Sequence, residues 1–127
     1  MERTRFIEHH GKKVLLLDYS GIREPPEAVR QIELSKRFVE RHPPKSLCVL
    51  TDTTDAHYDS VVVQALKDLA AHDEPFVYAS AVVGVVGLKK VVLTGVNLFS
   101  KRKIVMFDTR DQALDWLVQQ KPQAASA

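Results

Sequence analysis

The richest side-chain chemistry in this sequence lies between Asp52 and Ser60, where aspartates, threonines and a histidine follow an apolar run. Carboxylates with a nearby imidazole, such as Asp52, Asp55, Asp59 and His57, are groups that bind divalent ions or transfer protons. Their spacing matches no metal motif, and Asp and Thr are equally common in turns and helix caps. The segment therefore predicts a binding loop, with no metal or cofactor expected.

A second candidate is the Gly84-x-x-Gly87 segment, which Lys89 and Lys90 follow. At a strand-to-helix crossing, its backbone N–H groups and the lysine charges would suit a phosphate. Glycines also serve where two backbones pass closely, so both interpretations stay open.

Nucleophilic catalysis has weak support in the sequence. The single cysteine, Cys48, lies in an apolar run and is expected to be a buried thiol. No serine stands in a recognisable nucleophile elbow, and the five histidines fall near predicted element ends, where solvated side chains are expected. We expect a protein that is not an enzyme, with an enzyme that uses the acidic loop as the weakest alternative.

Composition limits the class of protein. The chain has 127 residues, 45% of them hydrophobic, and a formal net charge of +2. These values favour one globular domain, over residues 1–120 with a disordered tail at 121–127, and argue against nucleic acid as a partner. One cysteine and no signal-peptide pattern favour a reducing cytoplasm of bacterial type.

The elements that position these residues follow from periodicity and turn signals. The expected strands are 5–9, 13–19, 47–51, 76–83 and 103–107, and the expected helices are about 25–42, 59–72, 88–100 and 110–120. The order β-β-α-β-α-β-α-β-α predicts an α/β fold with a five-stranded mixed sheet and an antiparallel first strand.

The third expected helix has an unusually wide apolar surface with basic residues on both sides. A helix of this kind buries itself in the core, closes over a ligand, contacts a second copy, or lies on an anionic membrane. The residues assigned to such a lid or membrane-contacting helix are Leu88, Val92, Val96 and Phe99.

With these elements and several diffuse motifs, the chain resembles the STAS superfamily, and more closely its SpoIIAA-like branch, which is related in fold to the CRAL-TRIO lipid-transfer domains. The motifs are the segments 14–21, 49–52, 59–60, 79–84, 88–90 and 107–117. In regulatory STAS proteins, a partner kinase phosphorylates a serine in an Asp-Ser-Ser-Gly-type sequence. Here Asp59 and Ser60 are followed by Val61 and Val62, so the usual phosphoacceptor is missing and only Ser60 is a phosphorylation candidate.

The resemblance implies a non-catalytic binding or regulatory module that contacts a partner protein through the loops at the carboxyl ends of its strands. The alternative is a carrier or sensor of a small amphipathic, lipid-like ligand, with peripheral membrane contact through the third helix. A homodimer is also left open. The expected ligand- or partner-binding residues are Asp18, Ser20, Asp52, Thr53, Thr54, Asp55, His57, Tyr58, Asp59, Gly84, Gly87, Lys89 and Lys90.

Overall fold

A computed structural model describes residues 2–57, 59–86 and 104–122 of the chain. These described residues form five strands, three α-helices and one short 3-10 turn. They are β1 (Thr4–His9), β2 (Lys12–Asp18), α1 (Pro25–Val39), β3 (Leu47–Asp52), α2 (Ser60–Asp73), η1 (Glu74–Phe76), β4 (Val77–Val83), β5 (Ile104–Phe107) and α4 (Arg110–Gln119).

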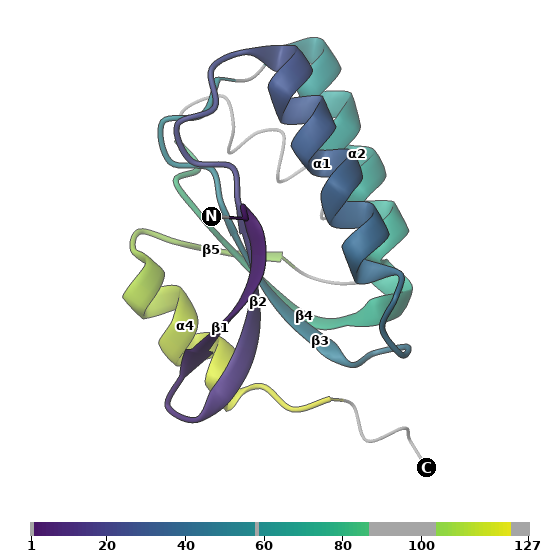
Figure 1. Ribbon diagram of the computed structural model, residues 1–127. Helices are drawn as coiled ribbons and strands as arrows, with labels where there is room; N and C mark the ends of the chain where they lie inside the picture. Colours follow the sequence, from purple (N-terminus) through teal and green to yellow (C-terminus); the bar gives the residue numbers. More distant parts are fainter. Residues whose placement is uncertain (1, 58, 87–103, 123–127) are drawn as a thin grey trace.

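The five strands form one mixed sheet in the order β1-β2-β3-β4-β5. Strand β1 is antiparallel to β2, and the other three neighbouring pairs are parallel. Helices α1 and α2 lie side by side on one face of the sheet and α4 covers the other (Figure 1). This arrangement is the mixed α/β sheet with an antiparallel first strand that the sequence predicts.

Side chains along the central strands point alternately to the two faces of the sheet, and each face carries its own hydrophobic core. On β2, Leu15 and Leu17 face α1 and α2, whereas Val14 and Leu16 face α4, and all four side chains are fully buried. A strand that is covered on both faces needs such a continuous apolar run. By the same alternation, Asp18 at the end of β2 lies on the α4 side of the sheet.

Local signals explain the helix boundaries. Pro25 and Pro26 occupy the first turn of α1, where a missing N–H costs nothing. The Asp59 carboxylate accepts a hydrogen bond from the Val62 amide and caps α2, and the Thr109 hydroxyl does the same for α4 through the Gln112 amide.

The expected helix over 88–100 lies outside the described residues, so the described order is β-β-α-β-α-β-β-α. Among the helices of residues 2–57, 59–86 and 104–122, none has the length and apolar character needed to cross a bilayer.

Candidate functional site

The loops after β2, β3 and β4 meet at one edge of the sheet and are hydrogen-bonded to one another. The Tyr19 amide donates to the Asp52 carbonyl, and the Gly21 amide donates to the Thr54 carbonyl, both at 2.8–2.9 Å. The Thr53 amide and hydroxyl both donate to the Val83 carbonyl. We call this surface the strand-end edge. Its three loops are those expected to lie together from the order of the elements.

Two carboxylates and an arginine form the charged centre of the strand-end edge. Asp18 and Asp52 are paired across the parallel strands β2 and β3, with both side chains on the α4 side. Arg110, the first residue of α4, donates from Nε to Asp52 Oδ2 at 2.6 Å, and its Nη2 lies 3.4 Å from Asp18 Oδ2. The guanidinium therefore bridges the two carboxylates and offsets the repulsion between them.

The remaining carboxylate oxygens also have partners. Asp52 Oδ1 accepts from the Thr54 amide at 2.9 Å, and Asp18 Oδ1 accepts from the amide and the hydroxyl of Ser20. The Arg3 guanidinium donates to the carbonyls of Asp18 and Ser20. This network fixes the loop after β2, because the Asp18 carboxylate and the Arg3 guanidinium each bind two groups at the start of that loop.

The hydrogen bonds and charges in this network favour the charged forms of Asp18 and Arg110. Partial burial works to raise the pKa of Asp18, but the hydrogen bonds from Ser20 and the nearby Arg110 and Arg3 guanidinium groups outweigh it and lower that pKa below its ordinary value. Burial likewise opposes the charged form of Arg110, but the hydrogen bond and charge of Asp52 raise its pKa. Asp18 is thus held as an anion, which suits ion pairing better than proton transfer near neutral pH.

Sequence reasoning missed Arg110, which lies 58 positions after its partner Asp52. One local signal was present. A basic residue in the first turn of a helix opposes the helix dipole, so it indicates an anionic partner elsewhere in the fold.

The acidic loop after β3 does not gather its side chains around one point. Asp52 pairs with Arg110, Asp59 caps α2, and Asp55 and His57 are exposed to solvent. Asp55 has a positive φ of 58°, a conformation that Asp tolerates in turns. In the described part of the chain, the only compact group of three metal-ligating side chains lies elsewhere.

Ser60, the phosphorylation candidate, is exposed at the first position of α2, and the cap of that helix is Asp59.

The surroundings of Gly84 support the interpretation that this glycine lets two backbone segments pass closely. Its φ is +84°, and a Cβ there would lie 2.4 Å from the Thr54 backbone nitrogen. Glycine therefore allows the chain after β4 to pass against the loop after β3. The other proposed anion ligands, Gly87, Lys89 and Lys90, lie outside the described residues, as do Tyr58 and the lid-helix residues Leu88, Val92, Val96 and Phe99.

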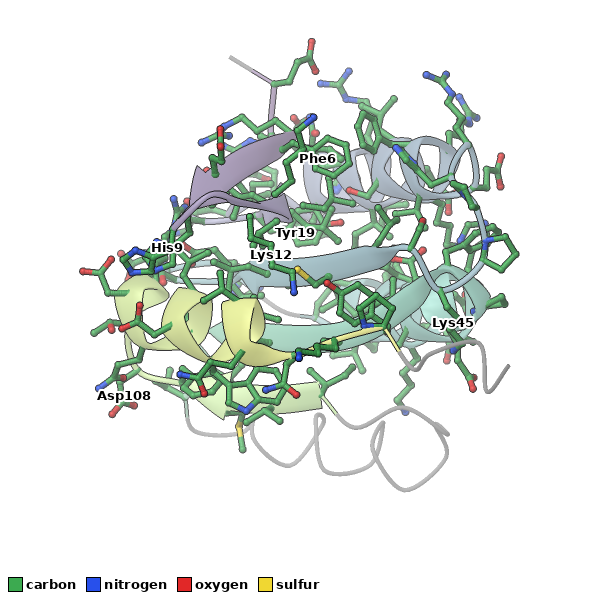
Figure 2. All side chains as sticks on the ribbon, turned by 90° about the horizontal axis from the view of Figure 1, so that it is seen from below. Phe6, His9, Lys12, Tyr19, Lys45 and Asp108 are labelled. Atoms are coloured by element: carbon green, nitrogen blue, oxygen red, sulfur yellow. The ribbon has the colours of Figure 1, made fainter. Side chains whose placement is uncertain are left out.

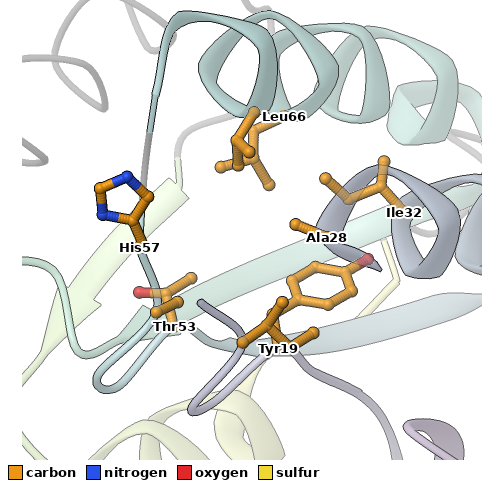
Figure 3. A pocket seen from close by; sticks show the side chains of 9 residues that line it. Tyr19, Ala28, Ile32, Thr53, His57 and Leu66 are labelled. Atoms are coloured by element: carbon orange, nitrogen blue, oxygen red, sulfur yellow. The ribbon is translucent and has the colours of Figure 1, made fainter. Parts of the chain in front are cut away.

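A small cavity lies under the strand-end edge, between the sheet and helices α1 and α2. Figure 3 shows Tyr19, Ala28, Ile32 and Leu66 around it, with Thr53 and His57 at one end. Most of the lining is apolar, and the space holds about one water molecule.

Cys48 is buried, as predicted, and burial raises the pKa of its thiol. Three histidines differ from the expectation of solvated side chains. The His9 side chain is 19% exposed and bonded to Asp115, and that of His72 is 27% exposed and bonded to Asp73 and Glu40. His42 is half-buried, with Nδ1 3.0 Å from the Phe38 carbonyl oxygen.

Comparison of the chain with protein-family models and with curated proteins finds no match.

Proposed function

We propose that this chain is a STAS-like domain of the SpoIIAA-like branch and acts as a non-catalytic binding module that contacts a partner protein through the strand-end edge. The order of the elements and the antiparallel first strand agree with that resemblance. One observation carries the proposal: the three loops are bonded into a single edge whose central carboxylates, Asp18 and Asp52, are already engaged by Arg110.

The pattern of hydrogen bonds favours binding over reaction. A general base needs an acceptor within reach of the substrate proton and a pKa near the working pH. Both Asp52 oxygens accept hydrogen bonds from the protein, and the lowered pKa of Asp18 removes it from that range. The edge therefore offers a fixed shape and fixed charges, which are properties of a preorganised interface.

Exposed side chains on this edge suggest the character of the partner. Val61, in the first turn of α2, is 59% exposed, and Val86, just after β4, is 64% exposed. Thr54, Asp55 and His57 are exposed on the loop between β3 and α2. Apolar side chains with polar neighbours are the usual composition of a protein interface. We expect a partner that presents apolar side chains to the valines and a basic group to Asp55.

Affinity capture with two matched variants tests this proposal. Val61→Asp adds a charge to the strand-end edge at a helix amino terminus, where an acidic residue is compatible with folding. Leu34→Asp places the same charge on α1, where Leu34 is 41% exposed. A protein captured by the wild type and by Leu34→Asp but lost with Val61→Asp supports the proposal. Equal capture by all three proteins contradicts it.

The apolar cavity is the observation that favours the second candidate, a carrier of a small amphipathic molecule. Because the space holds about one water molecule, an acyl chain would enter only if α1 and α2 moved apart. Titration with a fluorescent fatty acid tests this candidate. Saturable 1:1 binding that the cavity-filling variant Leu66→Trp abolishes would move the assignment to a carrier, and the absence of binding would remove that candidate.

A further inference from the structure

The turn of the β1–β2 hairpin meets α4 far from the strand-end edge. Alternation along β1 places Ile7 and His9 on the side of α4, and Figure 2 shows His9 beside that helix. His9 Nε2 lies 2.7 Å from Asp115 Oδ1, and His10 Nε2 lies 3.6 Å from the same oxygen. The three ligand atoms are all within 4.8 Å of one another.

We propose that His9, His10 and Asp115 form a binding site for a divalent transition-metal ion of the zinc class. Two imidazoles and one carboxylate are a ligand set that suits Zn²⁺, Ni²⁺ and Cu²⁺. The ion would join the hairpin turn to α4 and leave one position for water or for a group from another molecule. This site is independent of the proposed partner-binding edge.

The two separations that involve Asp115 fit such an ion after a small adjustment, and the two histidine ligand atoms lie within 4.8 Å of each other. In a tetrahedral zinc site with bonds of about 2.0–2.1 Å, neighbouring ligand atoms are about 3.3 Å apart. The 3.6 Å separation between His10 and Asp115 is already near that value. The 2.7 Å hydrogen bond between His9 and Asp115 would open by about 0.6 Å as the metal replaces the bridging proton. The side chains of His10 and Asp115 are 72% and 61% exposed, so they have room to move and an ion has access.

The charges around the site allow a cation to bind. Asp115 supplies an acidic side chain to the site, and both histidines lie within 3.6 Å of its Oδ1. Lys12 on β2 is the cross-strand neighbour of His9 and carries a competing positive charge. Its ammonium donates to the Gln120 carbonyl and lies 5.3 Å from the centre of the Tyr78 ring. The Lys12 charge is therefore directed to the carboxyl end of α4, and Asp115 is left to the two histidines.

Isothermal titration of the untagged protein with Zn²⁺ tests the proposal. We expect 1:1 binding with a dissociation constant in the micromolar range. His10→Ala and Asp115→Asn should each weaken binding roughly tenfold or more, because the loss of a direct ligand should cost at least as much as the loss of an outer-shell partner. His57→Ala, which removes an exposed histidine elsewhere, should leave it unchanged.

A second readout separates a specific site from general histidine binding. Saturating Zn²⁺ should raise the melting temperature of the wild type and of His57→Ala, but not that of His10→Ala or Asp115→Asn. All these side chains are exposed at the surface, so the variants should fold. Zn²⁺ binding that is only millimolar, or equal in the wild type and the two ligand variants, would overturn the proposal.

Discussion

Removal of the Arg110 guanidinium should destabilise the protein more than removal of an ordinary surface charge. In Arg110→Met, Asp52 Oδ2 loses its 2.6 Å partner, although the Asp52 side chain is only 6% exposed. Hydrogen bonds to charged groups are worth about 1.5–3 kcal/mol, and a carboxylate left unpaired in a protein interior costs about 3–5 kcal/mol. The Arg110 side chain is 38% exposed, so water can reach the vacated position and the lower range applies.

One effect opposes this loss. Arg110 stands in the first turn of α4, where its charge opposes the helix dipole, so its removal returns about 0.3–1 kcal/mol. We therefore expect a net decrease of about 2 kcal/mol in the free energy of unfolding. For a chain of this length, that decrease lowers the melting temperature by roughly 7 °C.

Urea denaturation of three variants checks this value. Arg30→Met removes an arginine whose pair with Glu27 is exposed, and it should cost much less stability than Arg110→Met, because exposed ion pairs contribute little. The double variant Arg110→Met, Asp52→Asn should recover part of the loss, because no buried charge is then left unpaired. If Arg110→Met costs no more than Arg30→Met, Arg110 does not neutralise Asp52 in the folded protein.

Two further predictions concern a glycine and a histidine. Gly84→Ala should lower the free energy of unfolding, measured by urea denaturation, by more than about 2 kcal/mol. Gly11 has a similar φ but open space around it, so Gly11→Ala should lower the free energy of unfolding by about 1 kcal/mol. Equal decreases would contradict the close backbone contact at Gly84. Burial opposes protonation of His72, but hydrogen bonds to Asp73 and Glu40 outweigh it and raise its pKa above 6.5. The stability that His72 adds over His72→Gln should be complete below pH 6.5 and disappear as the pH rises through the folded-state pKa; a difference that does not change with pH would contradict this coupling.

Most of the described fold could be predicted from the sequence, because local signals determine it. The apolar run Val14–Leu17 predicts a strand covered on both faces, and all four of its side chains are fully buried. Pro25 marks the start of α1, and Thr109 caps α4 as its spacing from Gln112 predicts.

The contacts of the candidate site were much harder to predict, because they join distant segments. Arg110 and Asp52 are 58 positions apart, and His9 and Asp115 are 106 positions apart. The sequence places Asp52 correctly at a strand end, but only the packing of α4 on the sheet reveals its partner. For the same reason, the sequence groups Asp52 and Asp59 in one loop, whereas the fold directs Asp52 to Arg110 and Asp59 to the cap of α2.

Native mass spectrometry of the protein isolated gently from its native cells is the decisive test of partner binding. We expect the 14.3 kDa chain in a stoichiometric complex with a second protein, and this complex should be lost in Val61→Asp and kept in Leu34→Asp. A chain that carries a stoichiometric small molecule and no protein partner would contradict the binding-module proposal and identify a carrier.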